Sequence, residues 1–126
     1  MRRPRVPGAL PLTVLGLAGA AVAQAPGGDL GRGAALFEDR CAMCHLAGGG
    51  GQGPSLKGVY ARKAGAAPGF HYSAALAGSG LTWTAVELDR FLAGPAKAVP
   101  GTAMAVAVSD PARRRDLIAY LRAASR

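Results

Sequence analysis

The apolar positions of the chain begin with a nearly continuous run close to the N-terminus. Residues 10–22 are almost entirely apolar, follow a start with three arginines, and lead into the small residues of the segment 21–25. A basic start, an apolar middle and an A-x-A end are typical of a cleaved signal peptide. A transmembrane span is the alternative, but it needs about 20 predominantly apolar residues, and glycine and alanine dilute this run.

We therefore predict a signal peptide over residues 1–23 and one domain over residues 24–126. Cleavage after Ala23 is preferred over cleavage after Ala25, because the second site would leave Pro26 at the new terminus. Three later segments have the period of helices, and each follows a residue suited to cap a helix N-terminus. These capping residues are Asp29, Thr84 and Asp110.

The first predicted helix continues from Asp29 to Arg40, directly before a cysteine. The second forms a capping-box pattern between Thr84 and Glu87 and continues to Gly94. The third follows Asp110 and starts with a proline, which is favoured in the first turn of a helix. These three segments are the predicted helical framework.

Glycine, proline and polar residues dominate between these helices. Residues 48–54 include five glycines and are predicted to form a surface loop. Residues 55–82 have neither a helix nor a strand period, so we expect loops with one short helix. Residues 99–104 are predicted to be another loop. Since no alternating strand pattern is sustained, the predicted fold class is all-α, with helices and long loops.

The net charge of the chain excludes few classes of function. The chain has 15 Lys and Arg against 7 Asp and Glu, and loss of the three arginines before residue 24 leaves 12 against 7, a formal charge of +5. No basic stripe with interleaved aromatic residues occurs, so nucleic acid is not a predicted partner. The arginines 113–115 cluster at the start of the last helix, and we interpret them as a solvated helix end, with a positive docking patch as the alternative.

The two cysteines of the chain carry its clearest chemistry. Cys41 and Cys44 are three positions apart and His45 follows at once. This is the haem-attachment pattern, although two cysteines in an exported protein would otherwise suggest a disulfide. On one helical turn the three side chains share a face, so two thiols could join one haem c while the imidazole holds its iron.

Two other interpretations of the cysteine pair are weaker. A thioredoxin-like dithiol needs a βαβ context, and none is predicted here. A zinc site needs four ligands, and beyond the motif only His71 remains. The sequence therefore predicts one covalent haem c, which would also complete the marginal core of a chain this small.

A second axial ligand for the iron is most simply a methionine, because a thioether is soft and neutral and favours reduced iron. Met1 leaves with the signal peptide, and Met43 lies between the cysteines on the wrong side of the attachment edge. Met104 remains, in a loop that could fold over the open face. An ordinary core methionine is the alternative interpretation of Met104, and His71 is a competing ligand.

Three further residues could bind the acidic groups of a haem. Arg62 could form charge-assisted hydrogen bonds with a propionate, although a solvated surface position is the alternative. Tyr72 and Trp83 have a hydroxyl and an indole N–H that need acceptors if they are buried, and propionate oxygens are candidates.

Residues 29–124 resemble the class I cytochromes c, which comprise the mitochondrial cytochrome c group and its bacterial periplasmic relatives. The motifs that carry the resemblance occur in the order of the family. They are Cys41-x-x-Cys44-His45, Gly53-Pro54-Ser55-Leu56, Arg62-Lys63-x-Gly65, Ala67-Pro68-Gly69-Phe70-x-Tyr72, Trp83, Pro100-Gly101-Thr102-x-Met104 and Asp116-Leu117-Ile118-Ala119-Tyr120-Leu121.

The resemblance implies a compact helical fold around haem, in which the first and last helices cross through Gly33, Phe37, Leu117 and Tyr120. It also implies that Met104 ligates the iron and that the carbonyl of Pro54 accepts a hydrogen bond from His45. By the same match, the propionates would be held by Arg62, Tyr72 and Trp83.

The chain departs from the family in three ways. Phe91 replaces a tyrosine whose hydroxyl reaches the methionine sulfur, and Leu76 replaces an asparagine, so we expect a drier pocket. Ala96 and Ala103 replace lysines that surround the exposed haem edge. These changes leave the predicted ligands intact and affect the potential and the partner.

The predicted function is that of a periplasmic, monomeric one-electron carrier in a respiratory or other electron transfer chain, and not that of an enzyme. Its partners would be a redox donor and acceptor, such as a membrane complex, an oxidase or a periplasmic dehydrogenase, with no membrane span after signal cleavage. Two alternatives stay open. One is a dedicated partner of one dehydrogenase, and the other is a haem enzyme or gas binder with an open sixth position.

Overall fold

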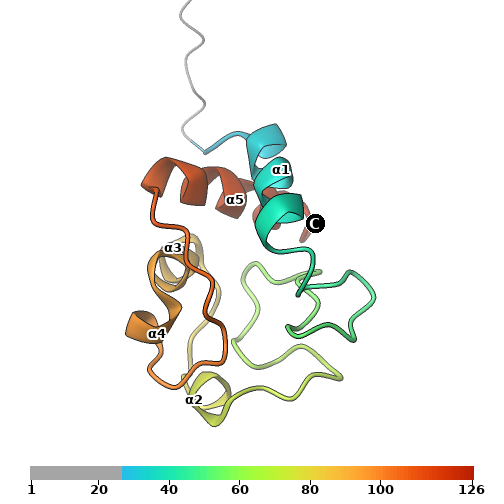
Figure 1. Cartoon of the computed structure of the whole chain (residues 1–126), viewed down its shortest axis with the longest axis vertical. Coiled ribbons are helices and arrows are strands. Elements are labelled where there is room, and N and C mark those ends of the chain that lie inside the picture. Colours follow the sequence, from blue (N-terminus) through green and yellow to red (C-terminus); the bar gives the residue numbers. More distant parts are fainter. Residues whose placement is uncertain (1–26) are drawn as a thin grey trace, which may run out of the picture.

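The computed structural model describes residues 27–126, so the predicted signal peptide and its cleavage site lie outside the described residues. The described chain is helical, with long loops and no sheet, which confirms the predicted fold class (Figure 1). Its β-pairing is limited to an isolated bridge between Lys63 and Thr82. None of its helices has the length and apolar character needed to cross a membrane. The helices are α1 (Leu30–Arg40), α2 (Ala74–Ala77), α3 (Ala85–Ala93), α4 (Pro95–Ala98) and α5 (Pro111–Ala123).

The first and last helices begin at the predicted capping residues. The side chain of Asp29 accepts a hydrogen bond from the amide of Arg32 at 2.7 Å. The side chain of Asp110 accepts one from the amide of Ala112 at 2.8 Å, and a proline occupies the first turn of α5. Both caps satisfy backbone donors that have no partner inside the helix.

The capping box predicted for α3 is only half formed. Thr84 Oγ1 accepts a hydrogen bond from the amide of Glu87 at 3.3 Å, as predicted. The reciprocal bond is absent, because the amide of Thr84 already donates to the carbonyl of Thr82 at 2.7 Å. The Glu87 carboxylate instead lies 3.4 Å from the guanidinium of Arg90.

Two short helices complete the fold. α2 is the single short helix expected within residues 55–82. α4 was not predicted and starts directly after Gly94, which separates it from α3. Its first residue, Pro95, has a fixed φ suited to the first position of a helix.

The cluster of arginines at the start of α5 is not uniformly solvated, which corrects the sequence interpretation. Arg113 and Arg115 are exposed, as expected. Arg114 is only 8% exposed, and its guanidinium lies against α3 and the end of the preceding loop.

α1 and α5 cross at a glycine, as the family resemblance implied (Figure 1). A Cβ atom on Gly33 would overlap the carbonyl oxygen of Asp116 and lie 2.8 Å from Cβ of Tyr120. The rings of Phe37 and Tyr120 pack at 5.3 Å between centroids. Leu117, at 1% exposure, is the most deeply buried large side chain of the core. The close approach of the two helices therefore depends on the missing side chain at position 33.

A buried carboxylate joins the start of α1 to α5. Asp116 accepts hydrogen bonds from the amide of Asp29 at 2.7 Å and from Nε and Nη2 of Arg32 at 2.7 and 3.2 Å. The hydrogen bond with Arg32 holds the pKa of Asp116 below its ordinary value, although burial acts in the opposite direction. Because its pKa is lower in the folded state than in the unfolded state, this carboxylate stabilises the fold when it is ionised.

We expect Asp116→Asn to destabilise the protein at neutral pH by about 1.5–3 kcal/mol, the usual contribution of a hydrogen bond to a charged group. The stability difference from the unchanged protein should be fully present above about pH 4, near the unfolded pKa of an aspartate, and should shrink as the pH falls through the lower folded pKa. Denaturant unfolding at pH 7 and at pH 3 measures this, with the exposed Asp39→Asn on α1 as control. An equal loss of stability at both pH values would contradict the assignment.

Candidate haem site

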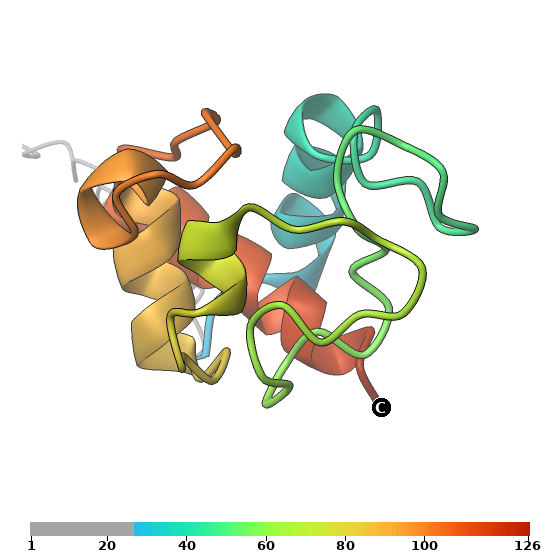
Figure 2. The same ribbon diagram turned by 90° about the horizontal axis from the view of Figure 1, so that it is seen from below.

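A cavity of about 300 Å³ lies in the middle of the described domain. Its walls come from the end of α1, the loop 44–62, the region of α2 and α3, the segment 102–106 and α5. Figure 2 shows the segment between α4 and α5 in orange on one side of the molecule and the loop after α1 in green on the other. Protein interiors rarely contain voids much larger than a water molecule, so a space of this size indicates a ligand pocket and not a packing defect.

Three chemistry-bearing side chains from one turn line the same wall of this cavity: Cys41, Cys44 and His45. The amides of Cys44 and His45 both donate to the carbonyl of Cys41, at 3.1 and 2.9 Å, which continues the helical path just after α1. Both thiols are free. Burial raises the pKa of the Cys41 thiol above its ordinary value, so before it is joined to a haem this group is protonated at neutral pH.

The imidazole of His45 is fixed in one orientation. Its Nδ1 atom lies 2.7 Å from the carbonyl oxygen of Pro54, which is the hydrogen bond that the family resemblance implied. A carbonyl can only accept, so this hydrogen bond requires the proton on Nδ1 and leaves the lone pair on Nε2. A Cβ atom on Gly53 would lie 2.6 Å from Cε1 of His45, so glycine is needed for the backbone to approach the ring.

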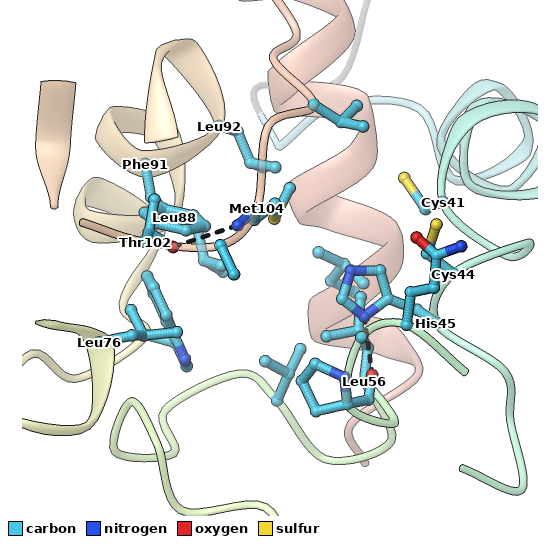
Figure 3. Close-up of a pocket in the computed structure, with 18 of the residues that line it drawn as sticks. Cys41, Cys44, His45, Leu56, Leu76, Leu88, Phe91, Leu92, Thr102 and Met104 are labelled. Carbon is cyan, nitrogen blue, oxygen red and sulfur yellow. Dashed lines mark hydrogen bonds between the residues drawn. The ribbon is translucent and has the colours of Figure 1, made fainter. Parts of the chain in front are cut away.

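Met104 lines the cavity from the other side, on the segment between α4 and α5 (Figure 3). Its amide donates to Thr102 Oγ1 at 3.4 Å. Within the described residues it is the one methionine in the lining, as His45 is the one histidine. Met43 is 89% exposed and His71 is also exposed, and neither lines the cavity.

Arg62 contributes a polar corner to the pocket. Its Nη1 donates to the carbonyl of Lys57 at 2.8 Å and its Nη2 to the carbonyl of Ser55 at 3.3 Å. Its Nε is buried without a hydrogen-bond partner among the described residues. A buried N–H without an acceptor is costly, and an anionic group of a bound ligand would satisfy it.

Tyr72 and Trp83 also line the pocket. The hydroxyl oxygen of Tyr72 accepts a hydrogen bond from the amide of Ala67 at 3.1 Å, which leaves its own proton available to donate. Trp83 is buried, and its ring packs 5.0 Å from that of Phe91. All three residues predicted for the propionates are thus brought to the same cavity.

The structure adds a residue that the sequence analysis missed. Arg40, the last residue of α1, is exposed and lines the mouth of the cavity, next to Cys41. Its position directly before the cysteine motif was the available signal. Ala103, Ala105 and Gln52 are the other exposed members of the lining, so its exposed part combines one cation and one amide with two small apolar side chains.

The residues present fit a haem c group. The cavity has two thiols beside an imidazole whose Nε2 is free of the Pro54 hydrogen bond, with a thioether in the wall formed by the segment 102–106. Most of the remaining walls are apolar, and the unsatisfied N–H of Arg62 suits an acidic substituent.

Comparison with known proteins agrees with this geometry. Residues 30–125 match the family model described as "Cytochrome c". The cytochrome c of Chlamydomonas reinhardtii is 45% identical over 107 residues, covering 82% of this chain and 96% of that protein. Cytochrome c2 of Agrobacterium tumefaciens is 45% identical over 101 residues, covering 75% and 90%.

A solved structure is similar over the same region. Cytochrome cH from Methylobacterium extorquens superimposes with a TM-score of 0.72 at 46% identity, covering 76% of this chain and 99% of that chain. Proteins of this kind carry a covalently bound haem c, for which the two cysteines of this chain are suited. On its sequence and on its structure, this chain belongs to the cytochrome c family.

Proposed function

We propose that this cytochrome c is an exported one-electron carrier in which His45 and Met104 ligate the iron while Cys41 and Cys44 form the thioether bonds. The observation that carries the proposal is the placement of His45 and Met104 on different walls of one apolar cavity (Figure 3). When bound, the haem supplies a one-electron couple between ferric and ferrous iron. Two protein ligands would fill the axial positions, which favours electron transfer over binding of a substrate or gas.

The chain's own residues tune that couple. The Pro54 carbonyl keeps the proton of His45 on Nδ1, so Nε2 is the nitrogen available as a ligand. Met104 offers a soft neutral sulfur, which stabilises the reduced state and raises the potential. Leu76 and Phe91 line the same cavity without a polar group, and an apolar surround disfavours the more highly charged oxidised state.

The acidic edge of the haem would be held by Arg62, Tyr72 and Trp83. This part of the proposal is supported by the buried N–H of Arg62 without an acceptor and by the free hydroxyl proton of Tyr72. The guanidinium is itself oriented by two backbone carbonyls, so it would meet a propionate with little loss of side-chain freedom.

Export to the periplasm is supported by the basic, apolar and small-residue pattern of residues 1–23. In that compartment the protein would act as a monomer between a redox donor and an acceptor in a respiratory or other chain. A membrane complex, an oxidase or a periplasmic dehydrogenase could fill these roles.

A second candidate is a dedicated partner of a single periplasmic dehydrogenase. The rim of the cavity favours it, because Ala103 and Ala105 are exposed there and Met43, beside the attachment site, is 89% exposed. Among the exposed residues of the cavity lining in the described part of the chain, Arg40 is the one cation, so long-range steering toward acidic partners would be weak. Recovery of the protein in a tight complex with one dehydrogenase distinguishes this role from that of a diffusing carrier.

The proposed function predicts a covalent and six-coordinate haem in the purified mature protein. Denaturing mass spectrometry should give the mass of the mature chain plus one haem, and the reduced protein should not bind carbon monoxide at neutral pH. Reversible one-electron electrochemistry should accompany both results. Haem that extracts into acidified organic solvent would contradict thioether attachment, and ready carbon monoxide binding would instead indicate a haem enzyme or gas binder.

A further inference from the structure

The segment that carries Met104 is held mainly at its two ends. At its start, the amide of Thr102 donates to the carbonyl of Val99 at 3.0 Å. Within the described residues, no hydrogen bond is formed by the backbone amides of Ala105, Val106 or Ala107. Apart from the packing of Met104 against the core, the position of the methionine therefore depends on the anchor at the far end of the segment.

That far anchor is residue 108. Val108 is buried, and its amide donates to the carbonyl of Leu92 in α3 at 2.8 Å. Its carbonyl accepts a hydrogen bond from Nη1 of Arg114 at 2.9 Å, and the same nitrogen donates to the carbonyl of Ser109, also at 2.9 Å. The chain is thus fixed four residues after Met104 through both backbone groups of one residue.

Arg114 is an unusual source for these hydrogen bonds because it is 8% exposed. A buried guanidinium is always charged and is tolerated only with several acceptors. Here Nε donates to Asp89 Oδ1 in α3 at 2.7 Å, and the two loop carbonyls supply the remaining acceptors. The side chain therefore joins α5, α3 and the end of the methionine segment in one network.

We propose that Arg114 is a positioning residue for Met104, holding the end of its segment so that the thioether stays over the cavity. Arg114 is not in the cavity lining, so it acts through the backbone of Val108 and Ser109. The proposal rests on the proposed function, because it takes Met104 to be the second axial ligand. If Arg114 served only to join α5 to α3, its hydrogen bond to Asp89 would be sufficient, and loss of the side chain would leave the ligation by Met104 unchanged.

The test compares Arg114→Met with Arg113→Met in the haem-loaded protein. Both variants lose one positive charge from neighbouring positions of α5, but Arg113 is exposed and its side chain makes no hydrogen bond or ion pair among the described residues. The measurements are the sulfur-to-iron charge-transfer absorption of the oxidised protein and the affinity for added imidazole, which competes with the methionine. Circular dichroism establishes that the helices are intact under the same conditions.

We expect Arg114→Met to weaken the charge-transfer absorption and to bind imidazole about tenfold more tightly, since a hydrogen bond to a charged group is worth roughly that factor. Arg113→Met should match the unchanged protein. Arg114→Lys, which can reach fewer acceptors, should give an intermediate affinity and keeps the test available if Arg114→Met does not fold. Unchanged imidazole affinity in the folded Arg114 variants, with lowered stability only, would overturn the positioning role.

Failure of the proposed function gives a different result. In that case the unchanged protein itself lacks the charge-transfer absorption, and Met104→Ala leaves its spectrum as it was. If instead the unchanged protein has the absorption and loses it with Met104→Ala, only the Arg114 variants decide the positioning role.

Discussion

Replacing Gly33 by alanine is expected to destabilise the protein by about 3 kcal/mol or more, at the upper end of the range for overpacked cores. The added methyl group would overlap the backbone carbonyl of Asp116 and press on Cβ of Tyr120. A backbone carbonyl inside α5 cannot turn aside as a flexible side chain can, so the two helices would have to separate. Denaturant unfolding of the haem-loaded protein measures the loss.

Gly31→Ala is a matched control on the same helix. Its methyl group would meet only Asp29 Oδ1 at 3.4 Å, an ordinary contact distance. Because alanine has a higher helix propensity than glycine, this variant should be as stable as the unchanged protein or more stable by up to about 1 kcal/mol. Equal stabilities for the two variants would show that the helices do not depend on the glycine at their crossing.

Met104→Ala should lower the reduction potential by on the order of 0.1 V and open the iron to carbon monoxide, because it removes a soft neutral ligand. The fold should survive, since Met104 is only partly buried and lies at the cavity wall. Electrochemical titration and the visible spectrum of the reduced protein under carbon monoxide measure the two effects.

Two variants serve as controls for Met104→Ala. Met43→Ala removes the same side chain from an exposed position between the cysteines, and His71→Asn removes the competing imidazole. Neither should change the potential or the haem spectrum. If His71→Asn opened the iron while Met104→Ala did not, the second axial ligand would be reassigned to His71.

The sequence predicted those parts of the fold that depend on local signals. Asp29 and Asp110 cap α1 and α5 because a side-chain acceptor and a helical period occur together there. The capping box at Thr84 is half formed because the turn at Thr82 takes up the amide that the box required. α4 was not predicted because a helix of one turn is too short to show a helical period of apolar residues.

In the candidate site, too, some features could be predicted from the local sequence and others could not. The cysteine and histidine motif is contiguous, so its chemistry could be predicted from spacing alone. The carbonyls that orient Arg62 come from a loop without a period, so they depend on tertiary structure. The burial of Arg114 between two exposed arginines could not be predicted, because it follows from the contact of α5 with Asp89 and not from the local sequence.

The crossing of α1 and α5 has a consequence for the order of assembly. It joins residues 30–40 to residues 111–123, so this contact cannot form until almost the whole chain has been synthesised. Closing so long a loop costs chain entropy before the contact stabilises it, and contacts of this sequence separation slow folding. Until then, the thiol of Cys41, which is buried in the finished fold, remains accessible. Both thioether bonds can therefore be made while the cysteines are still accessible, before α5 packs against α1 and closes the domain.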